Sequence, residues 1–322
     1  MNIKTMKVRN IGNLMLDKGS AVLGLILLFV IMSVLSADFL SLDNIINVFR
    51  QSAVLMIMAV AMTFIIITGG IDLSVGSQLA VSGVFVAGLI SAGIPVPIAV
   101  ILTIVIGGAI GLCTGAAVSF QRIPPFIMTL ALTTILSGIA FAYTKGTPIV
   151  INSASFRFLG RGYVGVIPVP VLIAVIVVII GYLLLTHTRF GRYVYAIGDN
   201  EETARLCGIN VPFVKIGVYV FGGMVTAIGG VLLASRLSAG TPNSGTGSEL
   251  DAIAAVVLGG TSLFGGEGKI TGTVVGVLII SFLNNGLNLL NVSSYNQMLI
   301  KGLVILLAVW ISTLKARKGM AH

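Results

Sequence analysis

Three asparagines lie in a segment that is otherwise almost entirely apolar. Asn284, Asn285 and Asn288 fall in the run 271–290, which contains no charged residue. Asn284 and Asn288 are four positions apart and therefore share one face of a helix. Amide groups donate and accept hydrogen bonds without a fixed charge, so this face can replace the water bonds of a neutral polar solute. The alternative role is hydrogen bonding between neighbouring helices, worth about 0.6 kcal/mol per contact in membranes.

Acidic and hydroxyl side chains stand at the ends of other apolar runs. Asp72, followed by Ser74, lies in a Gly-rich turn. There the carboxylate can cap the next helix or contact a solute, and we favour capping. Ser248 and Asp251 form a Ser-x-x-Asp pattern that we expect to organise the start of a helix. Arg236 lies in the preceding predicted loop, where it meets either solvent or a partner.

The chain lacks the residues of an ATPase or of a membrane enzyme. Its nearest approach to a phosphate-binding loop is the segment 265–270, which lacks both the spacing and the hydroxyl residue after the lysine. His187 and His322 are the only histidines, and no zinc motif or nucleophile–base arrangement accompanies them. We therefore expect no catalytic residues, no metal site and no cofactor in this chain.

Composition places these residues in a membrane protein. Of the 322 residues, 57% are hydrophobic and 9% are charged, whereas soluble domains carry roughly 25% charged residues. Mean hydropathy is +1.10. The 40 glycines fit this class, because small residues let transmembrane helices approach one another closely.

Long apolar runs predict an all-α integral membrane fold with about ten transmembrane helices. The run 250–265 is short and Gly-rich, so its helix can be broken or re-entrant, provided that its backbone is buried in protein or lines a cavity. No soluble domain interrupts the runs, and we expect one transmembrane domain, 1–322. The predicted spans are 20–36, 45–68, 74–92, 96–118, 124–143, 167–185, 214–234, 250–265, 271–290 and 296–313.

The placement of lysine and arginine orients the chain. With both termini in the cytoplasm, 13 of the 19 basic residues lie on the cytoplasmic side and 6 on the other, as the excess in short cytoplasmic loops requires. A cleavable signal peptide is the alternative for the first run, and we favour an uncleaved helix because the basic leader is long. The net charge of +9 thus reflects topology rather than nucleic-acid binding.

The longest predicted cytoplasmic loop, 188–215, contains a short helix with signals at both ends. Asp199 or Asn200 can serve as N-cap, and Glu202 completes a capping-box pattern with Asp199. Glu201 is positioned for an i,i+4 pair with Arg205. A closing glycine in the left-handed conformation is expected at Gly208.

A helix of about two turns is marginal in water and needs a surface to rest on. It either packs on its own transmembrane bundle or docks on a cytoplasmic partner and transmits motion to it. The residues alone leave these two interpretations equal.

Four sequence blocks resemble the bacterial permeases for ribose, xylose and galactose in ATP-binding-cassette importers, and most of all the ribose permeases. The similarity runs in order from about residue 38 to residue 313. The blocks are the loop with Gly191-Arg192, Ala196, Gly198, Asn200-Glu201, Ala204-Arg205-Leu206 and Gly208-Ile209-Asn210; Thr68 to Ser77; Gly247 to Ser262; and Phe282 to Leu290 continued by Asn291 to Met298.

This resemblance implies a permease in the bacterial inner membrane that moves a monosaccharide, with ribose the leading candidate. It implies a second copy of the chain, a cytoplasmic ATPase that holds ATP and Mg²⁺, a periplasmic or lipid-anchored sugar-binding protein, and membrane lipid around the bundle. Residues 199–208 are then the coupling helix that docks on the ATPase. The corresponding coupling residues are Asp199, Asn200, Glu201, Glu202, Ala204, Arg205 and Gly208. Asp199 and Cys207 depart from the glycine and serine that we expect there, without removing a cap.

The sugar route and the energy source are inferred from the residues themselves. The expected residues of the sugar route are Asp72, Ser74, Asn284, Asn285 and Asn288. The rival function is a self-sufficient sugar carrier driven by an ion gradient. Such carriers hold ionisable residues deep in the membrane, whereas the predicted spans here are almost free of them.

Overall fold

The computed structural model describes residues 21–319, and within this part the chain is almost entirely helical. Two short antiparallel ribbons, β1 with β4 and β2 with β3, are its sheets. An N-terminal helix spans Ala21–Leu35. The other elements are η1 (Ala37–Leu40), α2 (Leu42–Ile67), α3 (Val75–Ser91), α4 (Val96–Phe120), α5 (Pro125–Thr144), β1 (Ile149–Val150), α6 (Ala154–Arg161), β2 (Tyr163–Val164), β3 (Ile167–Pro168), α7 (Val169–His187), α8 (Arg189–Asp199), α9 (Glu201–Leu206), α10 (Val211–Leu237), β4 (Ala239–Gly240), α11 (Ser248–Leu258), α12 (Ile270–Leu289) and α13 (Ser294–Gly319).

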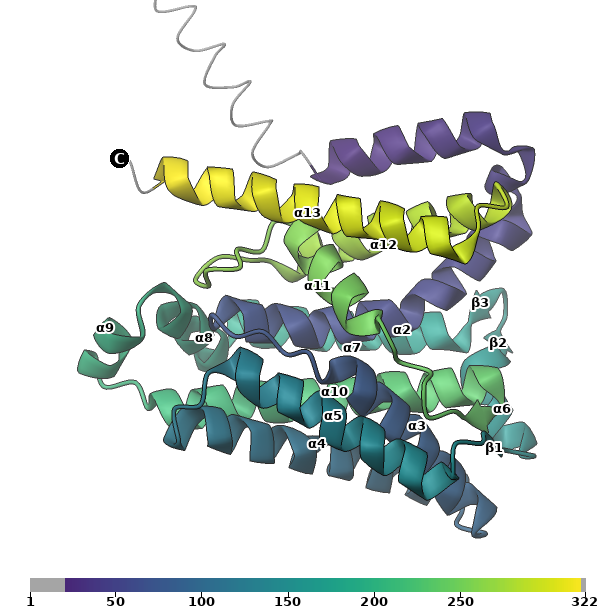
Figure 1. Cartoon of the computed structure of the whole chain (residues 1–322), viewed down its shortest axis with the longest axis horizontal. Helices are drawn as coiled ribbons and strands as arrows, with labels where there is room; N and C mark the ends of the chain where they lie inside the picture. Colours follow the sequence, from purple (N-terminus) through teal and green to yellow (C-terminus); the bar gives the residue numbers. More distant parts are fainter. Residues whose placement is uncertain (1–20, 320–322) are drawn as a thin grey trace, which may run out of the picture.

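In the described part of the chain, six helices are long and apolar enough to cross a membrane: α2, α4, α5, α7, α10 and α12. Ala21–Leu35, Val75–Ser91 and Ser294–Leu307 are shorter apolar helical segments. The long helices run roughly parallel to one another (Figure 1). Apolar side chains such as Ile101, Ile127 and Ile176 point outward and are more than half exposed. These features make the chain an all-α membrane protein.

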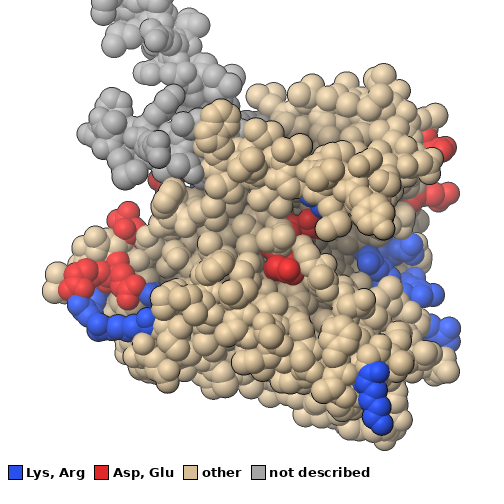
Figure 2. All heavy atoms as spheres, in the orientation of Figure 1, with Lys and Arg blue, Asp and Glu red and all other residues tan. Residues whose placement is uncertain are grey.

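Charged side chains gather at the two ends of this bundle. Figure 2 shows one cluster of acidic and basic residues at the end formed by α8 and α9, which we call the α9 end, and a basic cluster at the opposite end. The second cluster lies over α6 and the two ribbons, and we call it the α6 end. Between the ends the surface is mostly uncharged, with a few charged side chains near the middle of this face (Figure 2).

Helix α2 forms the centre of the bundle. Its residues from Ala53 to Ile67 are nearly all buried, and α7, α10, α11 and α12 pack around it. The tightest packing joins α4 to α10 through glycine. A Cβ on Gly111 would stand 2.1 Å from the backbone oxygen of Tyr219. The two backbones therefore touch directly, as small residues allow in membrane helices.

Two helices, α3 and α11, are shorter than the six long helices and begin inside the bundle (Figure 1). Residues 75–84 of α3 are buried from the first turn onward. A Cβ on Gly245 would stand 1.9 Å from the backbone oxygen of Gly76, so the start of α3 touches the segment that precedes α11. The predicted span 250–265 is wrong in its second half: α11 ends at Leu258, and residues 259–269 form a glycine-rich loop.

Candidate functional site

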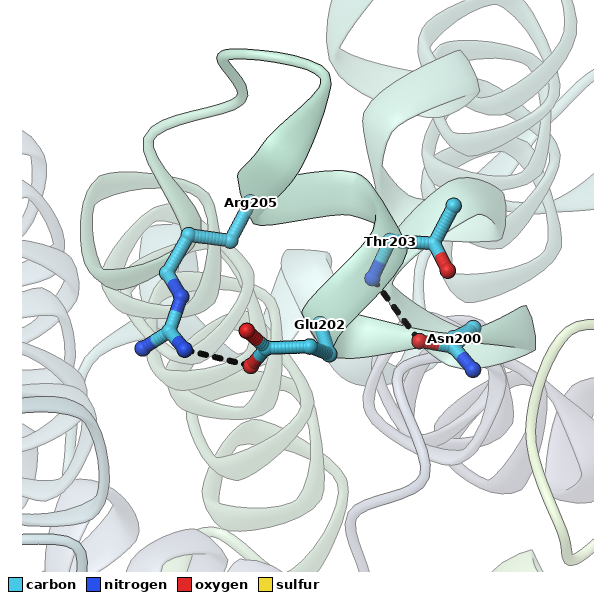
Figure 3. A network of polar contacts seen from close by, with 4 residues as sticks. All are labelled: Asn200, Glu202, Thr203 and Arg205. Atoms are coloured by element: carbon cyan, nitrogen blue, oxygen red, sulfur yellow. Dashed lines mark hydrogen bonds and ion pairs between the residues drawn. The ribbon is translucent and has the colours of Figure 1, made fainter.

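The helix predicted over 199–208 is divided between two elements. Thr188 caps α8, its hydroxyl accepting a hydrogen bond from the Gly191 N–H at 3.2 Å, and Asp199 is the last residue of α8. Asn200 Oδ1 accepts the Thr203 N–H at 2.8 Å and so caps α9 (Figure 3). Of the two candidate caps, Asn200 is therefore the one used. The predicted capping box of Asp199 with Glu202 is wrong, because the cap lies one residue later and places Thr203 at the third position.

The charges around α9 pair differently from the prediction. Arg205 forms an ion pair with Glu202, three residues before it (Figure 3). Glu201 instead accepts a bond from Lys215 Nζ on α10, at 2.6 Å. The predicted Glu201–Arg205 pair is thus replaced by two others. Hydrogen bonding and the positive charge of Arg205 lower the pKa of the Glu202 carboxyl, which favours its ionised form beside the N-terminus of α9.

A Schellman motif ends α9 at its C-terminus. Gly208 has φ +82°, the left-handed conformation expected for it. Its N–H donates to the Arg205 carbonyl at 3.0 Å, and the Ile209 N–H donates to the Ala204 carbonyl at 3.1 Å. Ala204 is 4% exposed. Capping at both ends and the burial of Ala204 hold a helix that is too short to be stable alone.

The rest of α9 faces solvent. Glu202, Thr203 and Arg205 are exposed, Leu206 is 79% exposed and Phe213, just beyond on α10, is 75% exposed. We call these five residues the α9 face. It combines a balanced ion pair with two uncovered apolar side chains, a composition suited to a protein partner.

Helix α8 connects α9 to the centre of the bundle. A Cβ on Gly198 would stand 1.8 Å from the backbone oxygen of Ile67, at the end of α2, and 2.5 Å from the Gly266 nitrogen. Tyr195 donates its hydroxyl proton to the Gly268 carbonyl at 2.7 Å. The end of α2 and the loop 259–269 are therefore both in direct contact with α8. Sequence reasoning did not predict this contact, although Gly198 and Gly266 indicate that backbones approach one another closely here.

The three asparagines of α12 line a polar cavity of about 200 Å³. Helices α2, α10, α11 and α12 form its walls. Its lining residues are Val48, Gln51, Ser52, Val54, Leu55, Met58, Leu233, Arg236, Ser244, Ser248, Asp251, Ser281, Asn284, Asn285 and Asn288. We call this space the inner cavity. The structure thus brings Asn284, Asn285 and Asn288 together with polar residues from three other helices.

Asp72 and Ser74 do not line the inner cavity. Asp72 Oδ1 accepts bonds from the Ser74 backbone N–H at 2.7 Å and from the Ser74 hydroxyl at 2.6 Å. Both side chains are buried in the turn before α3. This geometry agrees with the interpretation that Asp72 organises the start of the helix.

Three ionisable residues occupy positions that the sequence did not predict. Arg236 lies in the last turn of α10 rather than in a loop, and it lines the inner cavity. Asp251 lines the same cavity and forms an ion pair with Lys301 of α13 at 2.9 Å. The Ser-x-x-Asp start predicted for α11 is wrong, since Gly247 is the N-cap and Asp251 is engaged by Lys301. Neighbours that only the folded chain brings together determine these roles.

A helical bundle with a lipid-facing belt, two helices that begin inside it and an internal polar cavity defines a membrane transport protein. Residues 44–309 match the family described as "Branched-chain amino acid transport system / permease component". The chain belongs to this family. It is therefore a multi-pass inner-membrane permease component and not an enzyme.

The chain is similar to ribose and xylose permeases. It is 46% identical to the ribose import permease protein RbsC of Escherichia coli (strain K12) over 299 residues, 92% of this chain and 93% of that protein. Identity to RbsC of Bacillus subtilis (strain 168) is 47%, over 91% and 92% of the two chains. Identity to the xylose transport system permease protein XylH of Haemophilus influenzae is 36%, over 87% and 91%. No solved structure matches the chain.

Proposed function

We propose that the chain is the membrane-spanning subunit of an ATP-driven importer and that it moves ribose into the cell. The observation that carries this proposal is the sequence identity of 46% and 47% to two ribose import permeases over more than nine-tenths of the chain. Xylose permeases are more distant, at 36%. The family description mentions branched-chain amino acids, but a cavity rich in amide and hydroxyl groups suits a polyol better than an aliphatic side chain.

The proposed topology is one domain, 1–322, that crosses the membrane about ten times with both termini in the cytoplasm. The N-terminal helix, α2, α3, α4, α5, α7, α10, α11, α12 and α13 are the proposed spans, with α3 and α11 crossing only part of the bilayer. The α9 end is then cytoplasmic. Basic residues near the two chain ends, such as Lys4, Lys18, Lys315 and Arg317, provide much of the charge excess that supports this orientation.

The proposed coupling element is α9 with its flanking residues, Asp199 to Gly208. It docks on a cytoplasmic ATP-binding-cassette ATPase, which holds ATP and Mg²⁺. The α9 face is free to do so, because Ala204 alone in α9 is buried against the bundle. Motion of the ATPase would pass through α8 to the end of α2 and to the loop 259–269.

The proposed assembly contains two copies of the chain, two ATPase domains and a sugar-binding protein outside the membrane. The binding protein docks at the α6 end. An open cavity of about 670 Å³ lies there, lined by Asp43, Asn44, Ile46, Asn47, Arg50, Tyr163 and Val166. We call it the outer cavity. The sugar then passes through the outer cavity toward Asn284, Asn285 and Asn288, while Asp72 and Ser74 act structurally.

Reconstitution tests this function against the gradient-driven alternative, which the partly buried Arg236, Asp251 and Lys301 make worth testing. The chain is placed in proteoliposomes alone, and then with its ATPase and binding protein, and uptake of labelled ribose, xylose and leucine is measured. We expect concentrative ribose uptake only with the ATPase and ATP. Uptake by the chain alone under a proton or sodium gradient would establish the carrier instead.

A further inference from the structure

Two polar atoms in the wall of the inner cavity have no hydrogen-bond partner. They are Oδ1 of Asn284 and Nη1 of Arg236. Both atoms are enclosed, and a buried donor or acceptor that is left unpaired costs free energy. One is an acceptor and the other a donor, and they come from two different helices, α12 and α10. The cavity therefore holds unused hydrogen-bonding capacity of both kinds.

Three other polar side chains of the cavity already have partners. Asn285 exchanges two amide hydrogen bonds with Asn44, and the Asn288 side-chain oxygen accepts a bond from Gln297 at 2.9 Å. Asp251, the acidic residue of the cavity, forms its ion pair with Lys301. Among the described residues, Arg236 forms no salt bridge. The fold thus leaves its guanidinium available.

A structural role for the Arg236 side chain is not evident in its contacts. The residue does help to fix the end of α10, but it does so through its backbone, whose carbonyl accepts a bond from Arg161 Nε at 2.6 Å. That bond does not depend on which side chain stands at position 236. The guanidinium is therefore free to serve a ligand.

The wall also carries further polar side chains, such as Gln51 and Ser281, and an apolar part. Val48, Leu55 and Met58 of α2 and Leu233 of α10 contribute this surface. A sugar ring carries hydroxyl groups at its edge and C–H groups on its faces, so it needs both kinds of wall. A volume of about 200 Å³ accommodates one monosaccharide. Each hydroxyl is both a donor and an acceptor, and so complements both Arg236 and Asn284.

We propose that Arg236 and Asn284 form the recognition pair of a monosaccharide-binding subsite in the inner cavity. The Arg236 guanidinium donates to hydroxyl oxygens of the sugar, and Asn284 Oδ1 accepts a hydroxyl proton. A small rotation of either side chain toward the cavity replaces an unpaired atom with a bond to the sugar. This inference rests on the proposed function, because it assumes that the transported solute is a sugar.

The test measures protection of a single cysteine and does not require transport. Ser281, which lines the same cavity on α12, is changed to Cys in a chain whose native thiols are removed (Cys113→Ser, Cys207→Ser). The complete importer is placed in nanodiscs and labelled with a methanethiosulfonate reagent. We expect ribose at about ten times its dissociation constant to slow labelling about tenfold. A Leu206→Cys reporter on the exposed α9 face serves as control and stays unprotected.

Two variants then test whether Arg236 and Asn284 bind the sugar. Arg236→Met and Asn284→Leu keep the approximate side-chain size and remove the hydrogen bonds. Each is expected to raise the ribose concentration for half protection on the order of tenfold. Arg236→Lys, which keeps a charged donor, is expected to retain part of the protection. Arg236→Lys and Asn284→Gln also keep the test valid if the larger changes prevent assembly.

The outcomes separate this inference from the function on which it rests. If the ribose concentration for half protection is unchanged in both variants, the recognition pair is overturned. An absence of ribose protection in an importer that still takes up ribose overturns it as well, and so does protection by inorganic phosphate or acetate in place of sugars. Protection by leucine, with no ribose uptake by the intact importer, would instead overturn the proposed function.

Discussion

Asn44 and Asn285 join α2 to α12 through two reciprocal amide hydrogen bonds, of 3.0 Å and 2.8 Å. Asn44 lines the outer cavity and Asn285 lines the inner one. The pair therefore stands between the two spaces that we propose a solute crosses in succession. Two neutral hydrogen bonds are worth only about 1–3 kcal/mol together, so a conformational change can break them.

A covalent cross-link between positions 44 and 285 should stop transport without disturbing assembly. Cysteines at both positions, in a chain without Cys113 and Cys207, are bridged by a short bis-methanethiosulfonate linker. We expect ribose uptake to fall to the background level and to return when dithiothreitol cleaves the linker. Each single-cysteine variant treated in the same way is the control. Full uptake by the bridged protein would mean that α2 and α12 do not separate here.

Substitution of Gly208 should uncouple the permease from its ATPase. Its φ of +82° costs a residue with a Cβ about 1 kcal/mol. Proline also removes the N–H that bonds to Arg205. We expect Gly208→Pro to insert and fold normally but to lose sugar-stimulated ATP hydrolysis, with Gly208→Ala intermediate. Cys207→Ser, at an adjacent exposed position, is the matched control. Normal uptake by the proline variant would exclude coupling through α9.

The Lys215–Glu201 ion pair should contribute to coupling more than to stability. Glu201 is largely exposed, and such pairs contribute about 0–1 kcal/mol to stability. Lys215→Met releases the start of α9 from α10. We expect this variant to hydrolyse ATP more slowly than the native chain when the sugar-binding protein is bound, with little change in its melting temperature. The charge exchange Lys215→Glu with Glu201→Lys restores the pair and should recover activity. No recovery in the exchanged pair would show that Lys215 acts in another way.

Low pH should destabilise helix α9, because it protonates Glu202. Arg205 holds the pKa of this carboxyl below its ordinary value of 4.5. Since the pKa is lower in the folded state, the contribution of the carboxylate is present above the ordinary value and is lost as the pH falls through the lowered one. Hydrogen exchange in residues 201–209 should therefore accelerate at low pH, after correction for intrinsic rates. Glu202→Gln should abolish this pH dependence. An equal dependence in both proteins would assign it to another group.

Sequence reasoning was most successful where a local pattern determines the outcome. The apolar runs located the long helices, and the isolated glycine at 208 located the end of α9, because both depend on nearby residues alone. It was least successful for Arg236, Lys301 and Asp251. Their roles follow from the packing of α10, α11 and α13, which no spacing along the chain encodes. The choice of Asn200 over Asp199 was also open, since adjacent residues with equal capping ability differ only in their tertiary contacts.

The α9 face provides the most direct test of docking. Leu206 is 79% exposed, so replacing it with Asp removes no internal packing and should leave the free energy of unfolding within about 0.5 kcal/mol. A desolvated carboxylate in an interface is costly unless it is paired. We therefore expect Leu206→Asp to copurify with much less ATPase and to lose uptake. Val150→Asp, at a 64% exposed position near the α6 end, is the control and should retain the ATPase. If Leu206→Asp also retains it, the α9 face is not the docking surface, and the partner must bind elsewhere at the α9 end.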